Sequence, residues 1–62
     1  MADVFILDKT HDLIRSTDDN GYYIQEFAND GKGTSRTSVI YKTSRDAFTA
    51  YRDNTVKYGK WD

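Results

Sequence analysis

Residues that could do chemistry are few in this chain of 62 residues. His11 is the only histidine, and Asp8 and Asp12 lie close to it in the sequence. A lone histidine in a polar turn is typical of a solvated surface residue, and no acid stands at a spacing typical of acid–base catalysis or metal binding. Cysteine is absent, which excludes a thiol nucleophile and thiolate metal sites in this chain. We therefore expect no enzymatic activity, no catalytic residues, no metal and no other cofactor.

The segment Gly31–Ser35 has some of the composition of a phosphate-binding loop. That motif needs a longer spacing between its glycines and connects a strand to a helix. Here the spacing is incomplete and the segment lies between two predicted strands, so we predict a turn. A chain of this size also has little room to enclose a pocket of several hundred cubic ångströms. We expect no small-molecule substrate.

Length and composition predict one small domain spanning residues 1–62. A chain this short buries only about 60% of the surface that its unfolded form exposes, so its stability is marginal. Without cysteine, association with itself or with a partner protein is the remaining route to extra stability. The N-terminus lacks the basic start and long apolar stretch of a secretory signal, and no segment reaches membrane-spanning length. We therefore predict a cytoplasmic location and no membrane association.

Strand and turn signals fill the first 42 residues. Asn20-Gly21 tolerates the positive φ that a two-residue hairpin turn requires, and Asn29–Gly33 predicts a second, longer turn. Residues 3–17 form either one strand or two. The segments expected to be extended are residues 4–7, 13–17, 22–28 and 34–42.

A helix is predicted after residue 42. The hydroxyl of Thr43 or of Ser44 can cap its first turn, and with Thr43 as the cap Asp46 takes the capping-box position. Gly59 is a stop signal, and we expect Trp61 beyond it to fold back onto the core. The residues at helical spacing along one stripe are Ala47, Phe48, Tyr51, Thr55 and Tyr58.

The fold class that follows is α+β: a three- to four-stranded antiparallel meander sheet with one C-terminal helix packed on one face, in the order β-β-(β)-β-α. A two-residue turn at Asn20-Gly21 places Arg15 opposite Glu26. A five-residue loop over 29–33 places Glu26 opposite Arg36. Opposite charges across a sheet are stabilising, which favours these registers, although other loop lengths would change them.

These registers divide the side chains between two sheet faces. One face contains Leu13, Arg15, Tyr22, Ile24, Glu26, Arg36 and Ile40. The other contains Ile14, Tyr23, Gln25, Phe27, Thr37, Val39 and Tyr41, with no formal charge. We expect the helix to cover the uncharged face. The charged face is then open, unless Trp61, Tyr58 or the N-terminal segment folds over it.

An open face with a charged centre and aromatic and aliphatic neighbours is typical of a protein-binding surface. The run Val4–Leu7 is apolar on both faces, so one of its faces also needs cover. Our first hypothesis is a non-enzymatic protein-binding module, a small inhibitor or adaptor of a kind common among phage and mobile-element accessory proteins. A homodimer would cover the same face. The residues expected to bind are Arg15, Tyr22, Ile24, Glu26, Arg36 and Ile40.

Charge is unevenly distributed along the chain. Residues 1–30 contain two basic and seven acidic side chains, and residues 31–62 contain seven basic and three acidic ones. Such asymmetry indicates either pairing of opposite charges across neighbouring strands or a basic binding face. The second hypothesis is nucleic-acid binding through phosphate contacts. The residues expected to make them are Lys32, Arg36, Lys42 and Arg45.

Three short segments support this second hypothesis: an aromatic strand (Tyr22-Tyr23-Ile24), a glycine–lysine turn (Gly31-Lys32-Gly33) and a helix entry from Tyr41 to Ala47. Over roughly half of the chain, this arrangement resembles the small N-terminal DNA-binding domain of tyrosine recombinases, which has three strands followed by a helix. Those domains are usually strongly basic on the sheet, whereas this chain has a net charge of −1 and Glu26 in mid-strand. Because affinity for nucleic acid depends on neutralising phosphates, protein binding stays the first hypothesis.

Overall fold

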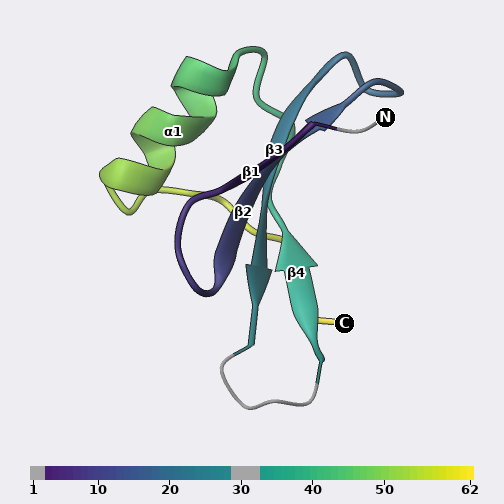
Figure 1. Ribbon diagram of the computed structural model, residues 1–62, viewed down its shortest axis with the longest axis vertical. Helices are drawn as coiled ribbons and strands as arrows, with labels where there is room; N and C mark the ends of the chain where they lie inside the picture. Colours follow the sequence, from purple (N-terminus) through teal and green to yellow (C-terminus); the bar gives the residue numbers. More distant parts are fainter. Residues whose placement is uncertain (1–2, 29–32) are drawn as a thin grey trace.

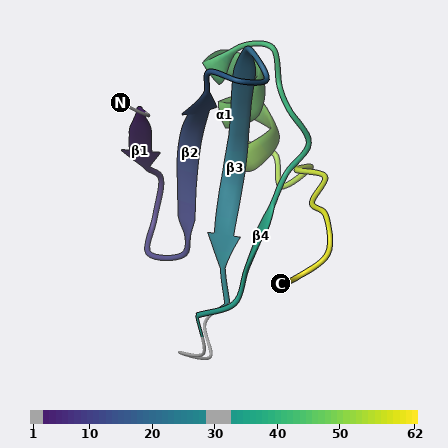
Figure 2. The same cartoon turned by 90° about the vertical axis from the view of Figure 1, so that its right-hand side faces the viewer.

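The computed structural model describes residues 3–28 and 33–62. Its elements are β1 (Val4–Ile6), β2 (His11–Ser16), β3 (Gly21–Phe27), β4 (Ser35–Thr37) and the helix α1 (Ser44–Arg52). The strands form one antiparallel sheet in the order β1-β2-β3-β4, with α1 lying across one face (Figures 1 and 2). The predicted α+β meander with a C-terminal helix is confirmed, and its N-terminal part forms two strands.

The hairpin between β2 and β3 differs from the predicted two-residue turn. Its loop is residues 17–20, in which Asn20 takes the left-handed φ of 52°. Gly21 is already a strand residue, opposite Ser16. A Cβ at Gly21 would lie 2.5 Å from Cγ2 of Ile40 and 2.6 Å from the carbonyl oxygen of Tyr41. The glycine is therefore needed for the close passage of the chain at residues 40–41 and not for the turn.

The longer loop changes the pairing of β2 with β3. Arg15 lies opposite Tyr22, and His11 takes the place opposite Glu26 that was predicted for Arg15. The predicted row of Arg15, Glu26 and Arg36 is wrong at Arg15, whereas Glu26 does lie opposite Arg36. Because the register shifts by an even number of residues, the division of β2 and β3 side chains between the two faces is unchanged.

The helix covers the sheet face that we expected to be open. Ile24 is fully buried on that face and forms the core with Leu13 and Ala47. The charges of the face do not prevent this burial, because Glu26 and Arg36 pair with each other at 2.5 Å. The expectation that the uncharged face lies under the helix is therefore wrong.

The segment after β4 contains a bulge. Strand β4 ends at Thr37, earlier than predicted, and Tyr41 pairs again with Tyr22 through two backbone hydrogen bonds of 2.7 Å. On β3, residues 23 and 24 separate this pair from the pair Gln25–Thr37. On the other segment, residues 38–40 separate the same two pairs, and one extra residue on one side is the pattern of a bulge. Because of the bulge, Ile40 and Tyr41 each lie on the sheet face opposite to the predicted one. Tyr41 packs against the core, and Ile40 lies with Thr37 on the other face.

Helix α1 begins as predicted and ends earlier. Thr43 is its N-cap, and Oγ1 of Thr43 accepts a hydrogen bond of 3.1 Å from the backbone N–H of Asp46. Asn54, with a left-handed φ of 58°, follows the helix, so the predicted stop at Gly59 is wrong. Within the described part of the chain, no helix has the length and apolar character to cross a membrane.

The C-terminal residues 57–62 run antiparallel beside β4 (Figure 2). Three backbone hydrogen bonds of 2.9 Å hold them there: Val39 N to Lys57 O, Gly59 N to Thr37 O and Asp62 N to Ser35 O. Trp61 does not pack onto the core as predicted: it is exposed, with the guanidinium of Arg36 lying 4.5 Å from its ring centre. This segment covers the outer edge of β4.

Candidate functional site

The sheet face away from α1, which we call the open face, presents six apolar or aromatic side chains and five polar ones. Residues paired across an antiparallel sheet point to the same side. Val4 pairs with Ile14, and Ile14 pairs with Tyr23, so these three large side chains form a row across β1, β2 and β3. The side chains of the open face are Val4, Ile6, Asp12, Ile14, Ser16, Tyr23, Gln25, Phe27, Ser35, Thr37 and Ile40.

Large apolar side chains on the open face reach solvent. Ile6 is 81% exposed, and Val4, Phe27 and Ile40 are also exposed. Among the open-face side chains of the described strands, Asp12 carries the one formal charge. A monomer seldom leaves an apolar patch of this kind uncovered unless it binds something. The composition matches the centre of a protein interface, where charged residues are depleted.

A hollow of about 370 Å³ lies at one end of the open face, beside the β2–β3 loop. Tyr23 and Ile40 line it together with the two acids Asp18 and Asp19. Acids at the margin of an apolar surface favour a partner whose own apolar contact area has a basic margin, because complementary charges steer the encounter and exclude wrong partners.

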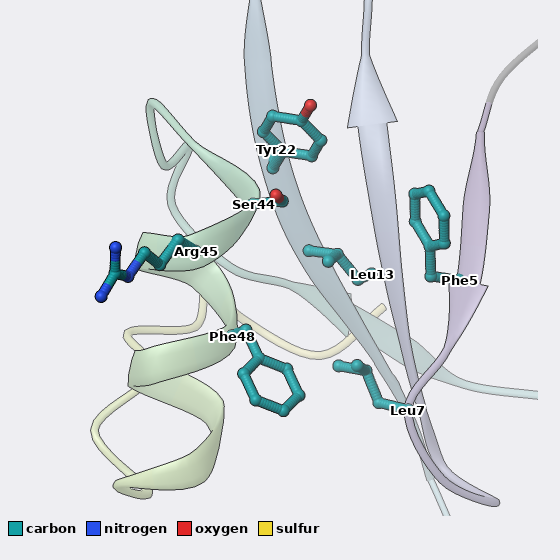
Figure 3. A pocket seen from close by; sticks show the side chains of 7 residues that line it. All are labelled: Phe5, Leu7, Leu13, Tyr22, Ser44, Arg45 and Phe48. Atoms are coloured by element: carbon teal, nitrogen blue, oxygen red, sulfur yellow. The ribbon is translucent and has the colours of Figure 1, made fainter.

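On the helix side, an apolar groove of about 470 Å³ lies between β1 and α1 (Figure 3). Phe5 and Leu7 form one wall, Leu13 lies on the floor, and Phe48 forms the other wall. Phe5 is 52% exposed and Phe48 is 47% exposed. Arg45 lies at the margin, with its guanidinium directed away from Leu13 (Figure 3). The groove suits an apolar side chain and lacks converging polar groups for a reaction.

A polar cluster joins the β1–β2 turn to the sheet and the helix. The hydroxyl of Tyr51 donates a hydrogen bond to Oδ2 of Asp8. His11 lies between two carboxylates, with Nδ1 2.9 Å from Oδ1 of Asp8 and Nε2 3.2 Å from Oε2 of Glu26. Nε of Arg36 donates to Oε1 of Glu26 at 2.5 Å. These five side chains form one connected chain of polar contacts.

The protonation states in the polar cluster follow from these contacts. The Tyr51 hydroxyl, and next the backbone N–H of Thr10, hold the pKa of the Asp8 carboxyl well below its ordinary value. The same hydrogen bond raises the pKa of Tyr51. Burial raises the pKa of Tyr58 to about 12. At neutral pH the cluster therefore contains an ionised Asp8 and a neutral Tyr51, and Tyr58 beside it is neutral as well.

The polar cluster does not have the geometry of a nucleophilic active site. Asp8 and His11 resemble the acid–histidine half of a catalytic triad, but the second ring nitrogen of His11 faces Glu26, where the triad needs a hydroxyl or a thiol. No group of three or more potential metal ligands in residues 3–28 and 33–62 could hold a metal ion. The contacts of the cluster connect the β1–β2 turn to the sheet and to α1.

The six residues predicted to bind a protein do not form one exposed surface. Ile24 is fully buried, and Tyr22 lines the groove. Arg15 reaches the surface on the helix-covered face, where its Nη1 lies 3.4 Å from Oδ2 of Asp3. Of the six, Ile40 lies on the open face, because of the bulge after β4. The remaining two, Glu26 and Arg36, belong to the polar cluster.

Of the four cations predicted to contact nucleic acid, the three in the described part of the chain are not gathered in one place. Arg36 pairs with Glu26, and its guanidinium lies over the rings of Tyr58 and Trp61 at 4.2 and 4.5 Å. Lys42 and Arg45 are exposed at the start of α1. Lys32 lies outside the described residues.

Sequence reasoning missed two features of these surfaces. It assigned His11 to a solvated turn, whereas Nδ1 of His11 lies 2.9 Å from Oδ1 of Asp8, three residues earlier in the sequence. It also placed Tyr23 and Phe27 under the helix, because it took a face without charges to be a buried one. The apolar character of residues 4–7 on both faces did signal exposed apolar surface at β1.

Comparisons with protein-family models, with curated proteins and with solved structures find no match to this chain.

Proposed function

We propose that this chain is a non-enzymatic protein-binding module, a small inhibitor or adaptor that docks through the open face of its sheet. The observation that carries the proposal is the exposure of large apolar side chains, from Ile6 to Phe27 and Ile40, on a face with one formal charge in its described strands. Burying such side chains against a partner is favourable by about 25 cal/mol per Å² of apolar surface.

The docking surface differs in its residues from the one predicted from the sequence. Its centre is the row Val4, Ile14 and Tyr23, with Phe27 at the last residue of β3 and Ile40 beside Gly21, the first residue of β3. The hollow with Asp18 and Asp19 forms its acidic margin. The partner that fits is a protein with an apolar contact area and basic residues at its margin.

Affinity capture with substituted chains tests this proposal. Phe27→Lys and Ile40→Lys each place a cation on the open face. On binding, this cation would lose its water and would be repelled by the basic residues at the margin of the partner's contact area. Phe48→Lys is the matched control, because Phe48 has similar exposure and lies on the helix. We expect the wild-type chain and Phe48→Lys to retain the same partner from native extract, and both open-face variants to lose it by at least about tenfold, which corresponds to about 1.4 kcal/mol.

The opposite result would be retention of the partner by Phe27→Lys and Ile40→Lys, or no partner for the wild-type chain. Direct titration with duplex and single-stranded DNA at several salt concentrations belongs to the same experiment. Affinity that falls steeply with salt and depends on Lys42 and Arg45 would favour the nucleic-acid hypothesis instead.

A further inference from the structure

Strand β1 is a free edge of the sheet in the described part of the chain. The opposite edge strand, β4, is covered by residues 57–62. Two backbone hydrogen bonds of 2.9 Å join the flanks of β1 to β2: Arg15 N to Asp3 O and Leu7 N to His11 O. They fix which peptide groups of β1 are used within the sheet.

Hydrogen-bonded pairs alternate along an antiparallel ladder. With Asp3 and Leu7 bonded to β2, Phe5 midway between them is bonded to β2 as well. The N–H and C=O groups of Val4 and Ile6 therefore point away from the sheet, where a further strand would pair.

Nothing in β1 blocks such a strand. Its side chains are uncharged and at least half-exposed, and an edge of this kind is a template for pairing unless a charge, a proline or a covering segment protects it. The acids on either side are occupied within the chain. Asp3 lies near Arg15, and Asp8 accepts hydrogen bonds from Tyr51 and from its own turn.

We infer that β1 pairs antiparallel with β1 of a second copy of this chain, about a two-fold axis at Phe5. Val4 of each copy lies opposite Ile6 of the other, and the outward N–H and C=O groups of both residues are then satisfied. Phe5 lies opposite Phe5 in a pair without direct hydrogen bonds, where side chains approach most closely. Aromatic and β-branched cross-strand pairs are stabilising, so the order Val-Phe-Ile makes the strand complementary to itself.

The exposed surface of the chain supports a second copy as the occupant. Its accessible area is 4762 Å², whereas a compact monomer of 7.2 kDa is expected to expose about 4,100 Å². The excess is of the order of the roughly 800 Å² that each partner buries in a standard protein interface. With a net charge of −1, two copies repel each other little.

The apolar groove gives the pairing a second contact. Phe5 forms its outer wall and is 52% exposed, so an exposed part of the groove lining lies on the strand where the second copy pairs. A two-fold axis perpendicular to the sheet places both helices on the same side and brings the two grooves together at Phe5. The open face stays free, so the dimer and the docking proposed above can fail independently.

Cysteine substitution tests the pairing directly, because the native chain has no cysteine. In an antiparallel pair without direct hydrogen bonds the Cα atoms lie about 4.5 Å apart. That separation is within the range of about 4.4 to 6.8 Å that a disulfide spans. Under mild oxidation we expect Phe5→Cys to form a covalent dimer and Phe48→Cys, on the opposite wall of the groove, to remain a monomer. Equal cross-linking of the two variants, or none for Phe5→Cys, contradicts the pairing.

Sedimentation equilibrium supplies the second readout, with circular dichroism as a check that each variant is folded. We expect a wild-type dimer, an unchanged dimer for Val39→Lys, whose side chain is 49% exposed and lies outside both β1 and the groove, and a dissociation constant raised at least about tenfold for Phe5→Lys. A wild-type monomer up to about 1 mM, where association is worth only about 4 kcal/mol, would overturn the inference. So would dissociation caused by Ile40→Lys and not by Phe5→Lys, which would place self-association on the open face.

Discussion

Nε of Arg36 donates to the carboxylate of Glu26 at 2.5 Å on the face that the helix covers. The two residues lie directly opposite each other on β3 and β4. Their pairing allows a charged face to be buried, and it leaves the uncharged face in solvent.

Removing this pair should destabilise the fold more than removing an exposed one. Glu26→Ala leaves the partly buried guanidinium of Arg36 without its carboxylate, at an expected cost of about 1–3 kcal/mol. Arg15→Ala breaks the exposed contact with Asp3, where at most about 1 kcal/mol is expected. Urea denaturation measures both. Equal losses of unfolding free energy for the two variants would contradict the role of the Glu26–Arg36 pair.

Gly21→Ala should be strongly destabilising. The added methyl group would meet the carbonyl oxygen of Tyr41 at 2.6 Å, and a backbone atom cannot move aside cheaply. We expect a loss of about 1–3 kcal/mol, the usual range for overpacking. Gly59→Ala is the matched control, because its nearest neighbour, the carbonyl oxygen of Thr37, lies at 3.6 Å. Thermal unfolding should separate the two variants clearly; the same midpoint for both would show that the close passage at residues 40–41 is not rigid.

Ser38→Ala should cost more than an exposed serine substitution. Oγ of Ser38 accepts a hydrogen bond of 2.8 Å from the backbone N–H of the fully buried Ile24. Leaving that donor without a partner costs about 1–3 kcal/mol. The control is Ser16→Ala, whose hydroxyl contacts Asp19 at an exposed loop. Chemical denaturation of the two variants, and the exchange rate of the Ile24 amide, measure the effect, and an unchanged amide exchange rate in Ser38→Ala would count against it.

Stability should fall in acid partly through Asp8. Its pKa is lower in the folded chain than in the unfolded one, so the stability it contributes is present above the unfolded value of about 3.9 and is lost as the pH falls below it. Tyr51→Phe removes the largest cause of the shift. We expect the difference in melting temperature between wild type and Tyr51→Phe to be larger at pH 6 than at pH 2. Tyr22→Phe, away from the polar cluster, serves as control; a constant difference for Tyr51→Phe across this range would exclude the coupling.

The layout of the fold follows from local sequence signals. Alternation of strand and turn residues predicts the meander, and Thr43 with Asp46 predicts where the helix begins. The pairing of Glu26 with Arg36 follows from charge complementarity across the sheet. These features depend on residues near each other in the sequence or on adjacent strands.

The position of the binding surface could not be predicted in the same way, because it depends on packing between distant residues. Gly21 has the sequence signature of a turn but is required by Ile40 and Tyr41, some twenty residues away. The bulge after Thr37, which turns Ile40 to the open face, has no local signal. The burial of Glu26 depends on two partners from other strands, His11 of β2 and Arg36 of β4.

Side-chain footprinting of the chain, free and bound to the partner that it captures, tests the proposed docking surface most directly. We expect oxidation of Tyr23, Phe27 and Ile40 to fall on binding, and oxidation of Phe48 and Trp61 to stay unchanged. Protection of Phe48 and Trp61, with the open face still oxidised as in the free chain, would contradict it.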